Sequence, residues 1–136
     1  MRCKILIPLL IAVAMTSCSR RSSAEHVGDR FIEAYYVQVD QVLALEHATG
    51  LARERLQTEL QQVTQLRRDG QFAQARPKVA YTHIRTQPEG RQVLLIYDLT
   101  ITPQQASPIL KRVMLITEPV GEQWKVINFT ETDTHP

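Results

Sequence analysis

The sequence has few of the residues and motifs from which enzyme active sites are most often built. It contains two cysteines, both within the first 18 residues, and its aromatic content is 6%. No glycine-rich phosphate loop, nucleophile elbow or pair of histidines at metal-ligand spacing is present. The four histidines stand singly, at His26, His47, His83 and His135. We therefore predict no metal site and no cofactor.

Basic residues do not dominate the chain once its first residues are set aside. The formal charge of +2 comes from sixteen basic and fourteen acidic residues. Arg2 and Lys4 precede Cys18, whereas all fourteen acidic residues follow it, so the remainder has a formal charge of zero. A nucleic-acid-binding domain normally carries a clustered basic face. We therefore expect no nucleic acid among the partners.

Residues 1–17 have the three-part layout of an export signal. Arg2 and Lys4 form a basic start, residues 5–15 are apolar, and small residues precede Cys18. A membrane-spanning helix needs roughly 20 apolar residues, so this stretch is too short to serve as one. The segment is predicted to be a signal peptide rather than an anchor helix.

The segment Met15-Thr16-Ser17-Cys18 resembles the lipobox of bacterial lipoproteins, with Met15 in place of the usual leucine. The resemblance implies that Cys18 becomes the first mature residue and carries a diacylglycerol. Each buried methylene of such acyl chains contributes about 0.8 kcal/mol to membrane binding. Ser19 is not the aspartate associated with inner-membrane retention, which favours the outer membrane, facing the periplasm. The alternative is an ordinary secretory signal with a coincidental cysteine.

The predicted processing accounts for both cysteines and places the folded domain close to the bilayer. Cys3 leaves with the leader and Cys18 takes the lipid, so no thiol remains for a disulfide or a nucleophile. Residues 18–23 are predicted to be a lipidated cysteine and a short tether. The five residues after Cys18 reach at most about 18 Å when fully extended. We therefore expect the domain to sit almost on the membrane surface.

The first half of the domain reads as helical. Ser22 and Glu25 have the spacing of a capping box, which predicts that a helix begins there. Its inward face is predicted to hold Val27, Phe31, Ala34 and Tyr35, and its solvated face Asp29, Arg30 and Glu33. Asp40 is placed to cap a second, short helix over 41–48. A third helix is predicted over 51–68, ended by Asp69-Gly70.

The second half reads as four strands, over 78–86, 91–102, 109–118 and 123–131. The second is the most apolar and fits an interior strand. Short links with proline or glycine, such as 87–90, predict an antiparallel meander. In the last strand, Trp124, Val126 and Asn128 are expected opposite Lys125, Ile127 and Phe129. The pattern predicts an α+β domain over 24–132, its helices on the concave face of a curved sheet, with a disordered tail at 133–136.

This order, with the closing segment Trp124-Lys125-Val126-Ile127, resembles the cone-shaped folds of the nuclear transport factor two-like superfamily, including small bacterial lipoproteins of that type. The stretches at 31–36 and 49–52 add local likeness. Fuller members interpose an extra strand or hairpin among the helices, which the sequence does not show. A cystatin-like layout, with one helix on the sheet, therefore stays open.

The resemblance also implies where a pocket would lie. Enzymes of the ketosteroid isomerase kind place an acid or histidine base and a tyrosine donor inside the cone. The candidates here are Tyr35, Tyr36, Tyr81, His83 and Asp98. Tyr97 and Asp98 cannot both face such a pocket, because neighbours on a strand point to opposite sides. The alternative is that the tyrosines are core residues and Asp98 pairs with Lys111 or Arg112.

Three functions fit these observations. The first is a non-enzymatic, membrane-anchored envelope lipoprotein that binds a small apolar ligand or an envelope protein. The second is an isomerase-like or cyclase-like enzyme. The third is an assembly accessory that works through an exposed sheet edge or groove. An apolar pocket with a convergent acid and tyrosine would favour the enzyme, whereas an exposed apolar patch would favour the interaction protein.

Overall fold

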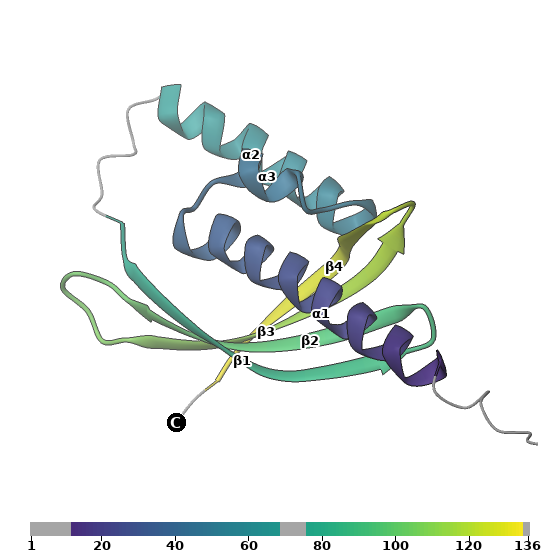
Figure 1. Cartoon of the computed structure of the whole chain (residues 1–136). Helices are drawn as coiled ribbons and strands as arrows, with labels where there is room; N and C mark the ends of the chain where they lie inside the picture. The colour runs from purple at the N-terminus through teal and green to yellow at the C-terminus, as the bar shows by residue number, and fades with distance from the viewer. Residues whose placement is uncertain (1–11, 69–75, 135–136) are drawn as a thin grey trace, which may run out of the picture.

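The computed structural model describes residues 12–68 and 76–134, and it places all the helices on one side of a curved sheet (Figure 1). The helical elements are α1 (Ala12–Ile32), the π-helix η1 (Glu33–Val37), α2 (Gln41–Leu45) and α3 (Gly50–Arg68). The strands are β1 (Lys78–Glu89), β2 (Gln92–Thr102), β3 (Ile109–Val120) and β4 (Gln123–Asp133). They pair antiparallel in the order β1-β2-β3-β4. The predicted α+β class and meander are confirmed.

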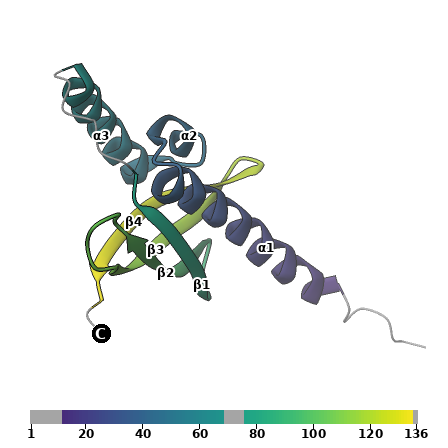
Figure 2. The same cartoon turned by 90° about the vertical axis from the view of Figure 1, so that its left-hand side faces the viewer.

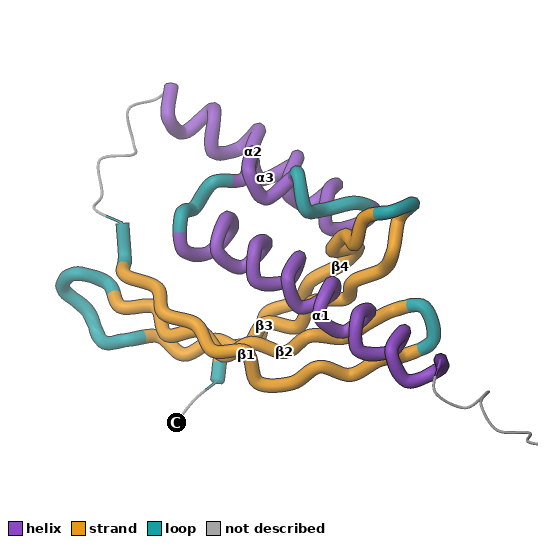
Figure 3. Tube along the Cα trace, viewed as in Figure 1, coloured by secondary structure: helices purple, strands orange, loops and turns teal. Residues whose placement is uncertain are grey.

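The core lies between α1 and the concave face of the sheet. Alternate residues of β2 are buried there, from Val93 through Leu95 and Tyr97 to Leu99, because side chains on a strand alternate between faces. Val113 and Leu115 of β3 join them, with Phe31, Ile32 and Leu56 from the helices. Figure 2 shows α1 lying over the sheet, and Figure 3 shows that every helix lies on the same side of it. The prediction that β2 is interior is confirmed.

Helix α1 begins earlier than predicted. Its backbone is helical from Ala12, so the proposed capping box lies inside the helix and the predicted tether at 18–23 is helical. The reason is that residues 12–21 contain no glycine or proline to interrupt a helix. A serine followed three residues later by glutamate marks a helix start only where the preceding residue leaves the helical conformation.

The short helices agree better with the sequence. Asp40 caps α2, since its carboxylate accepts a hydrogen bond from the Leu43 amide at 3.0 Å. The helix ends at Leu45 rather than at residue 48. Helix α3 begins at Gly50, one residue before the prediction, and ends at Arg68 as predicted. The proposed stop at Asp69-Gly70 lies outside the described residues.

Three strands are longer than predicted, and β3 ends at Val120 rather than at residue 118. Strand β1 continues through Pro88 to Glu89, so the turn is only Gly90-Arg91, and Gly90 adopts φ +59° there. Pro88 is tolerated because β1 is an edge strand. Strand β4 includes Thr132 and Asp133, and Asp133 pairs with Lys111 at 3.3 Å. The predicted disordered tail is therefore wrong at residue 133, and residues 135–136 lie outside the described part.

A bulge in each edge strand changes which side chains face inward. The register shifts at Ile84 in β1 and at Ile127 in β4, each of which lacks a partner across the strand. Val126 and Phe129 are consequently both buried, although they are three residues apart. The expected alternation through Asn128 is wrong beyond Val126, because one extra residue inverts every later position.

The connection between α2 and α3 lies along the edge of β4. A parallel bridge joins Ala48 to Val126. Val126 accepts from the Thr49 amide at 2.9 Å and donates to the His47 carbonyl at 2.8 Å. No further strand is formed within residues 12–68 and 76–134, where this bridge is the one strand-type pairing outside the four-stranded sheet.

Gly28 lets α1 lie directly against β2. A methyl group at this position would come within 2.4 Å of Leu95 Cδ1 and 2.7 Å of Tyr97 Oη. Both contacts are far shorter than van der Waals distance. No side chain larger than hydrogen fits between α1 and the sheet at this point.

We predict that Gly28→Ala destabilises the fold by about 1–3 kcal/mol, the usual cost of overfilling a core. Intrinsic propensity alone predicts the opposite sign, because alanine favours a helix interior over glycine by roughly 1 kcal/mol. Ser23→Ala, at an exposed position of the same helix, is the matched control and should change the free energy of unfolding by only a few tenths of a kcal/mol. Denaturant unfolding measures both. A more stable Gly28→Ala variant would contradict the close approach.

Candidate functional site

The five predicted pocket residues lie in three different places. Tyr35 and Tyr36 face α3 and β4, whereas Tyr81 and His83 lie on β1 near the central Tyr97. Asp98 lies on the outer face of the sheet, opposite to Tyr97. The structure therefore brings together two pairs of these residues and keeps Asp98 apart from both.

The first group, here named the Arg55 cluster, consists of Tyr35, Tyr36, Arg55, Glu59 and Glu131. Arg55 bridges the two carboxylates, with Nε 3.0 Å from Glu59 and Nη2 3.0 Å from Glu131. Tyr35 donates to Glu59 at 2.6 Å, and Tyr36 donates to Glu131 at 3.0 Å. The guanidinium lies 4.2 Å from the Phe129 ring centroid. Every member has a partner, and the cluster joins α3 to β4 and η1.

Burial and the adjacent carboxylates keep both tyrosines of this cluster protonated. Burial is the larger cause, and it raises the pKa of Tyr35 and Tyr36 above the usual 10.0. The hydrogen bond from Tyr35 to Glu59 adds to the effect, as does the negative charge of Glu131 beside Tyr36. Neither hydroxyl is a proton donor of lowered pKa. Glu59 lies among polar residues of α3, and nothing in its local sequence marks it as a member of this network.

The second group, here named the Tyr97 cluster, consists of Glu25, Asp29, His83, Thr86 and Tyr97. Tyr97 donates to Asp29 at 2.8 Å, and Thr86 donates to Glu25 at 2.5 Å. His83 Nε2 lies 3.0 Å from Thr86 Oγ1 and 3.0 Å from the Arg85 carbonyl oxygen. Because a carbonyl only accepts, we assign the proton to Nε2. Asp29 is exposed, as predicted, and its carboxylate also accepts the hydrogen bond of the buried Tyr97, which the sequence did not predict.

Asp98 makes an exposed ion pair. Arg112 donates to its two carboxylate oxygens at 2.7 and 2.9 Å. These hydrogen bonds hold the pKa of Asp98 below its usual value. An acid of lowered pKa on the convex face is unsuited to proton abstraction inside the fold. Of the two partners considered for Asp98, the structure places Arg112 there, while Lys111 pairs with Asp133.

Four hollows lie at the margins of the fold, with volumes of 580, 410, 640 and 210 Å³. None of these four is lined by any of the five predicted pocket residues. The close approach at Gly28 explains why the space between α1 and β2 is closed. Over residues 12–68 and 76–134, no three histidine, cysteine or acidic side chains are placed to hold a metal. Within the same ranges no helix is both long and apolar enough to cross a bilayer.

The outer face of the sheet carries an apolar group, here named the outer patch: Leu94, Ile96, Leu110, Met114 and Ile116. Leu94 pairs with Ile116 and Ile96 with Met114, so the central strands form adjacent apolar rungs. Leu110 and Met114 are 39% and 38% exposed, high values for large apolar side chains. Sequence reasoning recognised that one face of β3 holds Leu110, Met114 and Ile116, but it did not identify that face as exposed.

Polar side chains border the outer patch on both edge strands. On β4, Asn128 and Thr130 are paired with Ile116 and Met114. On β1, Arg85 and Gln87 are paired with Ile96 and Leu94. The Asp98–Arg112 pair separates Leu110 from the other four members. The outer face is thus apolar along β2 and β3 and polar at its rim.

Comparison with known proteins supports the fold. No protein-family model and no curated protein matches the sequence. A solved structure from Thiobacillus denitrificans, described as a calcium/calmodulin-dependent protein kinase type II association domain, matches with a TM-score of 0.57 at 12% identity. The match covers 83% of this chain and 96% of that one. The chain therefore has a nuclear transport factor two-like α+β fold, and at this identity the match shows the fold alone.

The tyrosines predict a distinctive alkaline transition. Tyr35, Tyr36 and Tyr97 all have a pKa raised above 10.0, chiefly by burial. A pKa raised by folding contributes stability that is present below about pH 10 and lost as the pH rises further, because the unfolded chain releases the proton first. We expect these three to ionise only as the chain unfolds. Tyrosinate absorbance and far-ultraviolet circular dichroism should therefore change together above about pH 10.

The same chain unfolded in denaturant is the reference, and its tyrosines should titrate near pH 10. Titration of more than one of the four tyrosines near that pH, with the circular dichroism still that of the folded state, would contradict the assignment of three buried hydroxyls.

Proposed function

We propose that this protein is a non-enzymatic association module, held at the bacterial envelope membrane by a lipid on Cys18, which binds another protein chain through the outer patch. The observation that carries the proposal is the exposure of this apolar surface. All the helices lie on the opposite face of the sheet, so none of them covers it (Figure 2). Contiguous apolar surface on a soluble domain commonly marks an interaction site.

The outer face has the layout of a protein interface. Interfaces bury an apolar centre that is poor in charged side chains and is surrounded by a polar rim. Here the apolar rungs of β2 and β3 form the centre, and threonine, asparagine, glutamine and arginine side chains of the edge strands, the last being Arg85, form the rim. The one pair of opposite charges within the face, Asp98 and Arg112, is internally neutralised.

A second copy of this chain is the occupant we favour. Four strands about 4.8 Å apart and about ten residues long form a face of roughly 650 Å². Because the face is convex, two copies would bury at most about 1,300 Å² in total, which reaches the lower end of the range of standard-size interfaces. When two such faces meet, the Asp98–Arg112 pair of each copy adds no net charge to the interface, because the two charges neutralise each other. Sheets that meet face to face commonly join their apolar sides in this way.

The solved neighbour offers independent support of a general kind. It is described as an association domain, which means that one chain with this fold has been assigned to assembly. The fold is therefore not necessarily enzymatic. No observation favours the isomerase or cyclase alternative over association. Asp98 faces outward, and the hydrogen-bonded pair Asp29–Tyr97 lines none of the four hollows.

We predict that Met114→Asp weakens self-association at least about tenfold, because the carboxylate would have to lose water against an apolar surface. The test is sedimentation equilibrium of the processed chain, extracted from its membranes in mild detergent. Leu51→Asp is the matched control, since Leu51 is 61% exposed on α3, which lies on the opposite side of the sheet from the outer patch. It should leave association unchanged.

Two results would count against this assignment. A chain that is monomeric at every concentration would exclude the second copy as occupant. If the chain is monomeric and a different protein is cross-linked to its outer patch, the association function would stand, with that protein as the partner in place of the second copy. Equal weakening by Leu51→Asp would show that the effect of Met114→Asp is not specific to the patch.

The lipid anchor has its own test. The intact mass of the chain from membranes should include acyl groups, and Cys18→Ala should remove them and release the chain from the membrane fraction, because buried methylenes supply the attachment. Cys3→Ala is the control, since Cys3 belongs to the predicted leader and its loss should change neither result. A Cys18→Ala chain that still partitions fully into membranes would overturn the anchor.

A further inference from the structure

A small basic hollow lies where α1 meets the hairpin of β1 and β2. It has a volume of 210 Å³ and is lined by Arg20, Arg21, Pro88 and Val93. Two guanidinium groups therefore stand against an apolar wall, and no carboxylate lines this hollow. Figure 1 shows the start of α1 beside the turn between β1 and β2. Glu25 and Thr86 of the Tyr97 cluster lie close by, one turn of α1 after Arg21 and two residues before Pro88, but they do not line the hollow.

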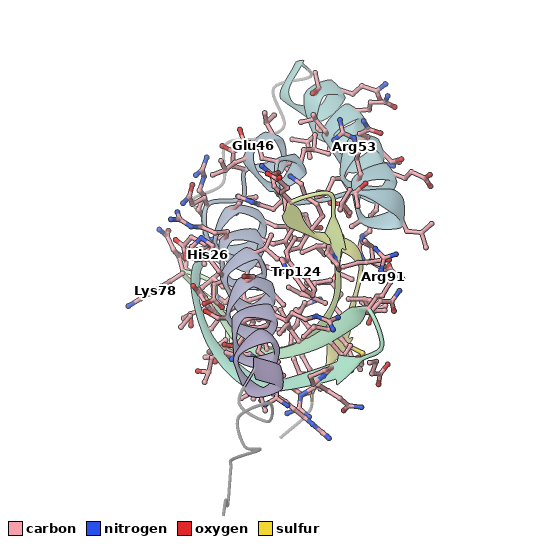
Figure 4. The ribbon with its side chains drawn as sticks, turned by 45° about the vertical axis from the view of Figure 1, so that its right-hand side comes forward. His26, Glu46, Arg53, Lys78, Arg91 and Trp124 are labelled. Carbon is pink, nitrogen blue, oxygen red and sulfur yellow. The ribbon has the colours of Figure 1, made fainter. Side chains whose placement is uncertain are left out.

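Arg20 is held in place from two sides. Its Nη2 donates to the Gly90 carbonyl at 2.9 Å. Its guanidinium also lies 5.9 Å from the Trp124 ring centroid, within the range of cation–π attraction. A long surface side chain fixed in this way loses less conformational entropy when it binds a ligand. Arg91 follows Gly90 and is exposed at the same turn, and Figure 4 shows Arg91 and Trp124 on the two hairpins flanking α1.

We infer that this hollow binds the phosphate of an anionic lipid headgroup. The planar guanidinium fork matches the oxygens of a phosphate, and Arg20 retains N–H donors beyond the one used by Gly90. The hollow has space for about seven water volumes at roughly 30 Å³ each. That is sufficient for a phosphate group with part of its glycerol. Pro88 and Val93 provide the apolar wall against which the glycerol carbons lie.

The position of the hollow favours a lipid over another phosphate ester, and this step rests on the proposed lipid anchor. Arg20 follows Cys18 by two residues of α1, which is about 3 Å along the helix axis. An acylated Cys18 would therefore place Arg20 and Arg21 at the level of the headgroups. Basic residues at that level gain attraction to anionic lipid.

The acidic residues near the hollow weaken the long-range electrostatic attraction of the site for an anion. The binding energy must therefore come from direct contacts with the two arginines. Glu89 accepts a hydrogen bond from Gln87 at 2.8 Å, and Glu25 accepts from Thr86. Glu122 lies on the other hairpin and lines the neighbouring hollow with Trp124. Binding should consequently depend on the two arginines that line the site and only weakly on the overall charge of the protein.

The experiment uses the processed chain in mild detergent and titrates it with glycerophosphoglycerol, the headgroup of an anionic lipid without its acyl chains. Arginine side-chain resonances followed by nuclear magnetic resonance report the binding. We expect saturable binding at one site, weakened about fivefold to tenfold by Arg20→Gln and also by Arg21→Gln. Inorganic phosphate should bind more weakly than the phosphodiester.

Arg53→Gln is the matched control, because Arg53 is exposed on α3, well away from the start of α1 (Figure 4). It should leave binding unchanged. Arg21→Gln guards against a folding defect, since Arg21 makes no side-chain hydrogen bond to another element among the described residues. Unfolding by denaturant should show wild-type stability for that variant.

Two outcomes would overturn the inference. If both arginine variants bind like the wild type, the hollow is not the site. If inorganic phosphate binds as tightly as the phosphodiester, the ligand is free phosphate and the lipid assignment is wrong. The probe is soluble and carries no acyl chain, so these results do not depend on lipidation of Cys18 or on the outer patch. Failure here is therefore distinguishable from failure of the proposed function.

Discussion

The close approach of α1 to β2 at Gly28 is the constraint on which the rest of the fold depends. It brings the Tyr97 hydroxyl up to the helix, where Asp29, the residue after Gly28, accepts its hydrogen bond. With the centre of the concave face closed, the polar groups of the interior are divided into two clusters on either side of α1. Each cluster satisfies its own hydroxyl and carboxylate groups, which a buried polar group requires. The interior thus stabilises the fold and offers little reactive chemistry.

The exposed features of the molecule follow from the same arrangement. Three helical segments and η1 all cover the concave face, so nothing within the described residues covers the apolar rungs of β2 and β3. The helix that closes the core also continues past the sheet toward the chain start, where it carries two arginines beside the first hairpin. The proposed association and the proposed membrane contact therefore use separate surfaces, one on the sheet and one at the end of α1.

The sequence predicted the fold where local pattern decides it. The apolar run of β2, the glycine at position 90 in the first hairpin turn and the aspartate at position 40 each have a short-range signal, and all three gave the correct element, whereas Pro88 and Pro119 lie within strands. The errors have longer-range causes. A single unpaired residue such as Ile127 inverts a strand face without any mark in the sequence. Glu59 and Asp29 lie among polar residues on helices, and only tertiary contact with Tyr35 and Tyr97 shows that they are partners.

The bridge between Ala48 and Val126 protects part of the β4 edge from pairing with a strand of another chain. It occupies the open hydrogen-bonding groups of β4 near the middle of that edge. The other edge, β1, has a bulge at Ile84, a proline at position 88 and a lysine at position 78, three features that resist the addition of a foreign strand. Many copies confined to one membrane plane meet often, and unprotected edges would let them polymerise without limit. With both edges obstructed, we expect the proposed contact through the sheet faces to stop at two copies.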